Sequence, residues 1–157
     1  MPNIATYTTK TTPMGADKLV GTDSVDGSTK NFALAGILPY DFPLGAEATI
    51  ASSEVLLRFV CPRALRLPAN LAGSVGSAAV APTASTTLTI RKRLSAATAY
   101  TSVATIVFGT GAAPIAATLS TQAAVDFAVG DELSVIGPVT ADATLAQWAV
   151  TLSAIYP

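Results

Sequence analysis

The segment Glu54–Asn70, EVLLRFVCPRALRLPAN, constrains the fold more than any other part of this sequence. Apolar residues recur there at every second position, which is the period of a β-strand. Val55, Leu57 and Phe59 are expected to share one face of a first strand. Pro62 has no N–H to donate to a ladder, so this strand must end there, and a second one follows it. The segment therefore predicts two strands joined at a proline corner.

The same alternation continues to the end of the chain, interrupted by glycine- and proline-containing turns. It marks strands at 86–92, 100–108, 115–119, 125–127, 132–136 and 145–156. Residues 71–83 hold mainly Ala, Gly, Ser and Pro and are predicted to be a loop. With seven or eight strands and no convincing helix, the pattern predicts an antiparallel β-sandwich or jelly roll. Trp148 is expected in its core, on a central strand.

The N-terminal part of the chain has a different character and is predicted to be an arm, residues 1–45, ahead of a β-sandwich domain, residues 46–157. Within the arm, a short strand begins at 18–21 and a second follows at 29–34, so a small hairpin is expected; 36–43 is expected to be a semi-rigid connector. Such a hairpin buries too little surface to be stable alone. The residues expected to attach it to a partner are Leu19, Val20, Phe32 and Leu34.

Composition narrows the classes of function. Charged residues make up only 12% of the chain and the net charge is −1. A surface so poor in charge suits packing among other subunits, so self-association is predicted. Nothing in this balance attracts nucleic acid or an anionic membrane. No apolar run is long enough to span a membrane, and the first ten residues do not resemble a signal peptide.

Little in the sequence suggests catalysis. The chain has no histidine and one cysteine, which excludes a Ser-His-Asp or Cys-His arrangement and the usual zinc sites. Asp126, Asp131 and Glu132 lie close in sequence, but Asp131 follows a glycine at a turn, where its side chain is expected to bond the backbone. Cys61 is expected to be a small buried hydrophobe. We therefore expect no enzyme activity, no catalytic residue, no cofactor and no metal site.

The arginines are the more promising polar residues. Arg58, Arg63 and Arg66 gather around the proline corner, and residues 91–93 form a short basic run. Nucleic-acid binding usually interleaves such residues with exposed aromatics, whereas the aromatics here alternate inward. The arginines are expected to pair with carboxylates, either in the same chain or across a subunit interface. They are thus candidate interface residues.

Two stretches resemble virion proteins of tailed bacteriophages. The first combines residues 54–73, the strand at 86–92, GDELSV at 130–135 and DATL at 142–145, in the order and approximate spacing of a domain that recurs in those proteins. The second runs from ADKLVGTD at 16–23 through KNFAL at 30–34 and resembles a hairpin near the start of phage fibre proteins. The chain departs from the pattern at 91–94, where a tight Asn-Gly turn would be expected, so a longer loop is predicted there.

The resemblance implies a non-enzymatic structural protein at the virion surface, as a fibre, spike or capsid decoration subunit. Its partners would be other virion proteins of the capsid, neck or tail, and its usual oligomer would be a homotrimer. The alternative is a module that recognises a host-surface glycan, for which an aromatic ring must be exposed beside polar groups. Tyr40 and Tyr100 are the only aromatic candidates outside the predicted core.

Overall fold

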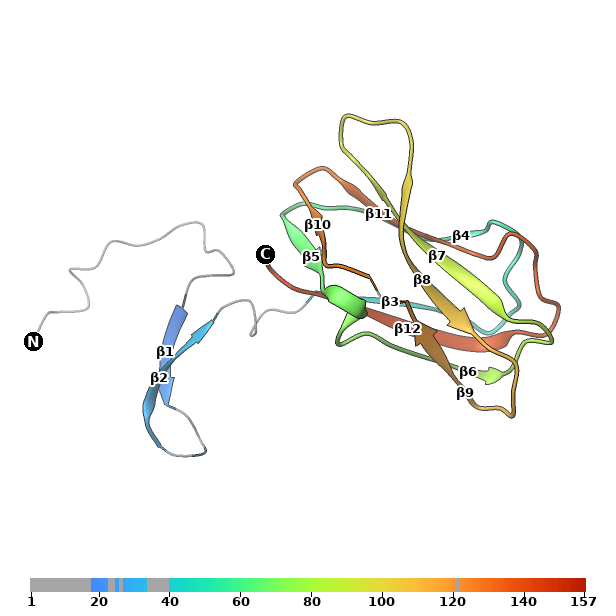
Figure 1. Cartoon of the computed structure of the whole chain (residues 1–157), viewed down its shortest axis with the longest axis horizontal. Coiled ribbons are helices and arrows are strands. Elements are labelled where there is room, and N and C mark those ends of the chain that lie inside the picture. The colour runs from blue at the N-terminus through green and yellow to red at the C-terminus, as the bar shows by residue number, and fades with distance from the viewer. Residues whose placement is uncertain (1–17, 23–24, 26, 34–39, 121) are drawn as a thin grey trace, which may run out of the picture.

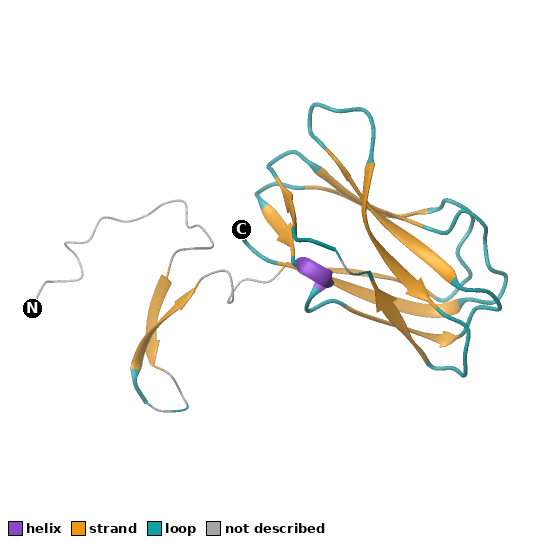
Figure 2. Cartoon of the chain, viewed as in Figure 1, coloured by secondary structure: helices purple, strands orange, loops and turns teal. Residues whose placement is uncertain are grey.

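Antiparallel strands make up the fold (Figures 1 and 2). The computed structural model describes residues 18–22, 25, 27–33, 40–120 and 122–157. Its strands are β1 (Lys18–Thr22), β2 (Thr29–Ala33), β3 (Tyr40–Ala46), β4 (Val55–Val60), β5 (Leu65–Leu67), β6 (Val75–Val80), β7 (Thr86–Arg93), β8 (Thr101–Phe108), β9 (Ile115–Leu119), β10 (Val125–Phe127), β11 (Glu132–Ile136) and β12 (Ala146–Ala154). One short 3-10 turn, η3 (Ala69–Leu71), completes the described elements. The predicted all-β class is confirmed.

The main sheet has eight strands in the order β3-β12-β6-β9-β8-β7-β11-β4. It is curled into a sandwich-like, nearly closed barrel. β9 joins the two halves of the sheet, because it pairs with β6 at one end and with β8 at the other. The first residues of β9, Ile115 and Ala116, pair with β6, and its last three pair with β8. Opposite walls then meet through their side chains: the rings of Phe108 on β8 and Trp148 on β12 lie 6.4 Å apart.

The alternation of apolar residues along each strand determines which side chains lie inside the barrel. On β7, Leu88 and Ile90 are fully buried, as their alternation predicts. On β12, Trp148 and Leu152 are buried on the same face, and the strand lies inside the sheet between β3 and β6. Burial of these side chains at about 25 cal/mol per Å² is the main stabilising contribution that the sequence pattern supplies.

The proline corner is confirmed, and it separates two sheets. β4 pairs with β11 in the main sheet, while β5 pairs with β10 in a two-stranded sheet. Leu65, Leu67 and Phe127 from this small sheet are buried in the same core cluster as the barrel residues. Arg66 and Ile155 also exchange backbone hydrogen bonds, which ties β5 to the end of the chain. The small sheet therefore contributes directly to the core.

Two sequence-based assignments are wrong. Part of the stretch predicted as a loop, 71–83, is the strand β6, which pairs with β12 and β9. Residues 40–43 of the predicted connector lie in β3, which pairs with β12 along its whole length. The sheet thus begins at Tyr40 and takes in residues 40–45 of the predicted arm.

The predicted N-terminal hairpin is present. β1 and β2 pair antiparallel, with Lys18 opposite Ala33 and Thr22 opposite Thr29. Within the part of the chain that the structure describes, these two strands form a sheet of their own. Gly27, in the turn between them, has a φ of 69°, a left-handed conformation that glycine adopts without strain.

Candidate interaction site

The hairpin places two of the four predicted attachment residues in solvent. Leu19 is 51% exposed and Val20 is 72% exposed. Phe32 lies opposite Leu19 in the strand register, although its side chain is outside the described set, as is Leu34. Two neighbouring apolar side chains are therefore left uncovered on β1, and a two-stranded hairpin gains stability by packing against something else.

The three arginines near the proline corner have separate partners. Arg66 makes a two-point contact with Asp126 across the β5–β10 pair, at 2.5 and 2.9 Å. Arg63 lies over the ring of Tyr40, 5.3 Å from its centroid, and donates a 3.5 Å hydrogen bond to the Tyr156 hydroxyl. Arg66 is thus already matched to a carboxylate in its own chain, whereas Arg63 contacts only aromatic groups in these interactions.

Arg58 belongs to a larger group on the outward face of β4, β11 and β7. At its centre Glu132, only 3% exposed, accepts hydrogen bonds from Arg58 Nε at 2.8 Å and from Arg93 Nη2 at 2.6 Å. The Tyr100 hydroxyl also donates to this carboxylate. The guanidinium of Arg91 lies over the Tyr100 ring, 4.4 Å from the centroid. We call these five residues the arginine patch.

Strand register explains how the patch forms. Glu132 lies opposite Arg93 on β7, and Ser134 on the same face of β11 lies between Arg58 on β4 and Arg91 on β7. Residues directly opposite each other share a face of a sheet, so these side chains must meet. Lys92 lies between the two β7 arginines and points to the other face, where it pairs with Asp131 at 3.1 Å.

The patch carries more positive than negative charge. Three guanidinium groups surround one carboxylate, and the hydrogen bonds from Arg58, Arg93 and Tyr100 lower the pKa of Glu132 to about 2. In the other direction, Glu132 and then Tyr100 raise the pKa of Arg58. Glu132 is therefore an anion and the patch keeps an excess of two positive charges at neutral pH.

Sequence reasoning missed this grouping, although it noted each arginine. The strand was predicted to end at residue 92, whereas β7 continues to Arg93 and so places Arg91 and Arg93 on one face. What the sequence did not contain was the insertion of β11 between β4 and β7, which brings Glu132 to these cations.

Asp131, in GDELSV, has a structural role. Asp131 accepts hydrogen bonds from the backbone N–H groups of Ser95 and Ala128, both at 3.0 Å, which confirms the predicted turn. Burial alone would raise its pKa, but these bonds and Lys92 lower it.

Asp142, in DATL, ties two loops together. Its carboxylate accepts hydrogen bonds from Thr83 and Ala84 in one loop and from Thr144 and Leu145 in its own, at 2.7 to 3.0 Å. The Thr144 hydroxyl bond is the main cause of a lowered pKa for Asp142. The carboxylate is thus fully engaged in holding the backbone.

Cys61 is 1% exposed, as expected for a buried small hydrophobe, and burial raises the pKa of its thiol to about 11. A thiol that stays protonated at neutral pH is a poor nucleophile. Over the described residues, no three Cys, Asp or Glu side chains come together in a way that could hold a metal ion. Nor does any helix in the described part of the chain have the length and apolarity to cross a membrane.

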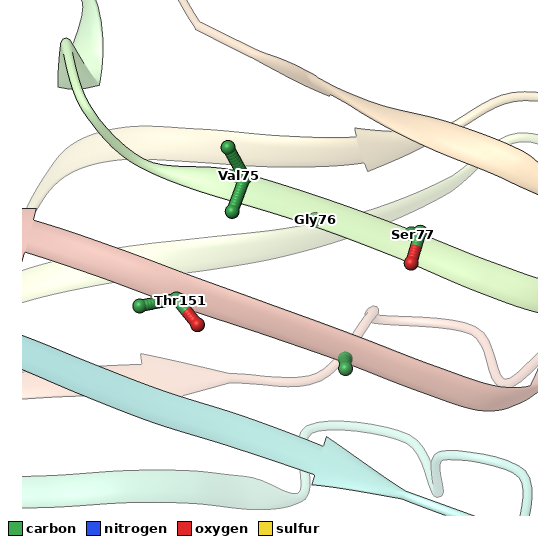
Figure 3. A pocket seen from close by; sticks show the side chains of 5 residues that line it. Val75, Gly76, Ser77 and Thr151 are labelled. Atoms are coloured by element: carbon green, nitrogen blue, oxygen red, sulfur yellow. The ribbon is translucent and has the colours of Figure 1, made fainter.

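The described part of the barrel surface has shallow hollows. One, of about 220 Å³, lies over β6 and β12 and is lined by Val75, Gly76, Ser77, Ala149 and Thr151 (Figure 3). Another, of about 380 Å³, is lined by Lys92, Leu94, Ala97, Ala99, Thr101 and Val103. Neither lining contains an aromatic ring, and the first contains no charge.

Comparison with known proteins adds no relative: no protein-family model, no curated protein and no solved structure matches this chain.

Proposed function

We propose that this chain is a non-enzymatic structural subunit of a bacteriophage particle, such as a fibre, spike or capsid decoration protein. The N-terminal hairpin anchors it, and the barrel is displayed at the virion surface. The observation that carries the proposal is the hairpin itself. Its strands pair with each other and with no other described strand, and they expose Leu19 and Val20. A segment of this kind gains order by packing on a partner.

The roles of the acidic motif residues support this assignment. In the stretches that resemble phage virion proteins, Asp131 and Asp142 hold loops together through backbone hydrogen bonds. Residues that fix loop geometry are what a displayed scaffold needs. The partners in this proposal are other virion proteins of the capsid, neck or tail.

Self-association as a homotrimer is part of the same proposal. The outer face over β6 and β12 is lined by small uncharged residues, and Val75 there is 65% exposed. A sheet face without charges can approach another subunit without burying an unpaired ion, which would cost several kcal/mol.

The glycan-recognition alternative has less support. A sugar would stack on an open aromatic face, but Arg91 already lies over the Tyr100 ring. The ring of Tyr40 is stacked against Phe42 and has Arg63 over it. Both candidate rings therefore already have neighbours at their faces.

The experiment that tests the proposal is to look for the chain in purified particles of its source phage. Antibodies raised against residues 40–157 are used for immunogold labelling, and particles from a phage with the gene deleted serve as the control. We expect regular labelling at one class of position on wild-type particles only. Absence of the chain from purified particles would overturn the proposal.

A further inference from the structure

The arginine patch lies beside an unpaired strand edge. β4 is the last strand of the main sheet, next to β11 (Figure 1), so one of its edges pairs with no other strand in the described part of the chain. β4 contains no proline, so each of its residues has an N–H group, and the alternate ones that point away from β11 are open to a partner strand. The other end strand, β3, carries Pro43, a device that discourages pairing at an edge. The two edges therefore differ, and β4 has the one suited to accept a partner strand.

The side chains along β4 determine what kind of strand this edge prefers. Arg58 is 60% exposed, and its guanidinium is held in place by Glu132 and by a 3.1 Å hydrogen bond to the Tyr100 hydroxyl. Two residues further along the same face, Val60 is 59% exposed. A fixed arginine beside an exposed apolar side chain is typical of protein–protein contacts. A second basic strand would be repelled here, and an acidic one would be attracted.

Arg91, two strands in from the edge of β4, contributes a third positive charge to the patch. Its Nε atom is buried and has no hydrogen-bond partner, while Nη2 donates to Ser134 at 3.1 Å. A buried donor on a charged group is costly to leave unpaired. Among the described side chains of the patch, Glu132 is the only carboxylate, and it is already shared by Arg58 and Arg93. An incoming carboxylate would offset the excess positive charge of the whole group.

We propose that the edge of β4 and the arginine patch bind an extended, acidic segment of a partner protein. The segment adds a strand to β4 through backbone hydrogen bonds, and its carboxylates lie on the face that carries Arg58, where Arg58 and the excess positive charge of the arginine patch attract them. A protein strand is favoured over an acidic sugar because the edge offers backbone donors and because the Tyr100 ring is covered. This inference rests on the proposed role as an assembly subunit, and it names the chemistry of one partner.

The test uses the full-length protein and a fluorescein-labelled peptide of four Thr-Glu repeats, with four Thr-Gln repeats as the neutral control and polygalacturonate as the sugar probe. Fluorescence anisotropy is expected to show binding of the acidic peptide that weakens as salt is added, and about tenfold weaker binding of the neutral peptide. Polygalacturonate is expected not to compete. Equal binding of both peptides, displacement by polygalacturonate, or no binding of the acidic peptide would each overturn the inference.

Variants locate the site. Arg58→Gln, at the exposed edge, is expected to weaken acidic-peptide binding by about fivefold, since it removes a charged contact. Arg91→Gln, two strands further in, is expected to weaken it by about twofold, since it removes one charge of the patch. Lys30→Gln in the hairpin removes the same charge elsewhere and is expected to leave binding unchanged. If all three variants weaken binding equally, the peptide responds to net charge alone and the patch is not the site. These tests use the isolated protein, so a failure to bind the peptide would not contradict the proposal that the chain is part of the particle. Likewise, absence of the chain from particles would not by itself contradict peptide binding.

Discussion

The ring of Phe42 on β3 packs edge-on against the ring of Phe59 on β4, with the ring centroids 4.9 Å apart. These strands are the two ends of the eight-stranded sheet and do not pair with each other. The sheet therefore curls until its ends meet through side chains rather than through a ladder. No backbone hydrogen bonds join β3 to β4, so this ring contact closes the core on that side.

Removing one of these rings tests how much the closure contributes. Phe42 is 6% exposed, and Phe42→Ala is expected to lower the free energy of unfolding by about 3 kcal/mol, because it removes both buried area and the ring contact. Urea unfolding followed by circular dichroism measures the change. Phe42→Leu, which keeps most of the volume, is the matched control and is expected to lose about half as much or less. Equal losses for both variants would show that the ring contact, and not the buried volume, accounts for the effect, and a loss below about 1 kcal/mol for Phe42→Ala would show that this closure contributes little to stability.

Trp148 gives a second test of the core. It is 2% exposed, and its indole N–H has no hydrogen-bond partner, so packing alone holds it. Trp148→Ala is expected to cost about 3–5 kcal/mol in urea unfolding. Trp148→Phe, which keeps a ring against Phe108 and removes the unpaired N–H, should cost clearly less. A loss below about 1 kcal/mol for the alanine variant would contradict a core role.

Strands with large alternating side chains were predictable from sequence, and strands built from small residues were not. The alternation of Leu88 and Ile90 with polar residues predicts β7, whereas the VGSAAV sequence of β6 has no comparable alternation. β6 is a strand because it pairs with β12 and β9 on either side. These neighbours also require small residues in it: a Cβ atom added at Gly76 would come within 2.9 Å of side-chain atoms of Ala117 and Val150. β3 was hidden by Pro43, which an end strand tolerates.

The candidate sites show the same limit. The hairpin was predictable because both of its strands and its turn are local in sequence. The arginine patch was not, because Arg58 and Glu132 are 74 residues apart and meet only through strand order. The spacing of apolar residues and the residue types in turns identify individual strands and hairpins. Which distant strands pair depends on the packing of the whole sheet, which a single sequence does not show.

Acid should remove the contribution of Glu132 in a defined range of pH. Its pKa is about 2 in the folded protein against an ordinary value of 4.5, so its contribution is fully present above pH 4.5 and is lost as the pH falls through about 2. Glu132→Gln is expected to destabilise the protein by about 2 kcal/mol at neutral pH, since it leaves two arginines short of their anion. The difference between wild type and variant, measured by urea unfolding, should stay constant from neutral pH to about pH 5 and narrow by about pH 3. A difference that stays constant to about pH 3 would contradict the ion-pair account.

Self-association is expected from the charge-free face over β6 and β12. Sedimentation of the full-length protein at micromolar concentration should show an oligomer, which we predict to be a trimer. Val75→Lys with Ser77→Lys places charges on this face and should shift the protein towards monomer, because like charges would have to be buried together. The matched control, Val139→Lys, changes an exposed valine elsewhere and should leave the oligomer intact. A strictly monomeric wild type would contradict this part of the proposal.

The central claim is that the hairpin attaches the barrel to the particle, and a truncated protein tests it most directly. The structure sets the truncation point: β3 supplies Phe42 and Leu44 to the core, so the armless protein must begin before Tyr40. A fragment of residues 39–157 is expected to unfold at nearly the same urea concentration as the full chain. This keeps a loss of attachment distinct from a loss of folding.

The decisive measurement is the occupancy of particles that lack the wild-type copy, after incubation with full-length protein, with fragment 39–157, or with Leu19→Asp/Val20→Asp in the full chain. Occupancy is read by quantitative mass spectrometry of repurified particles. We predict normal occupancy for the full-length protein and almost none for the fragment or the double variant, because exposed apolar side chains on β1 would no longer reach their partner. Normal occupancy by the folded fragment would show that attachment runs through the barrel and would contradict the account.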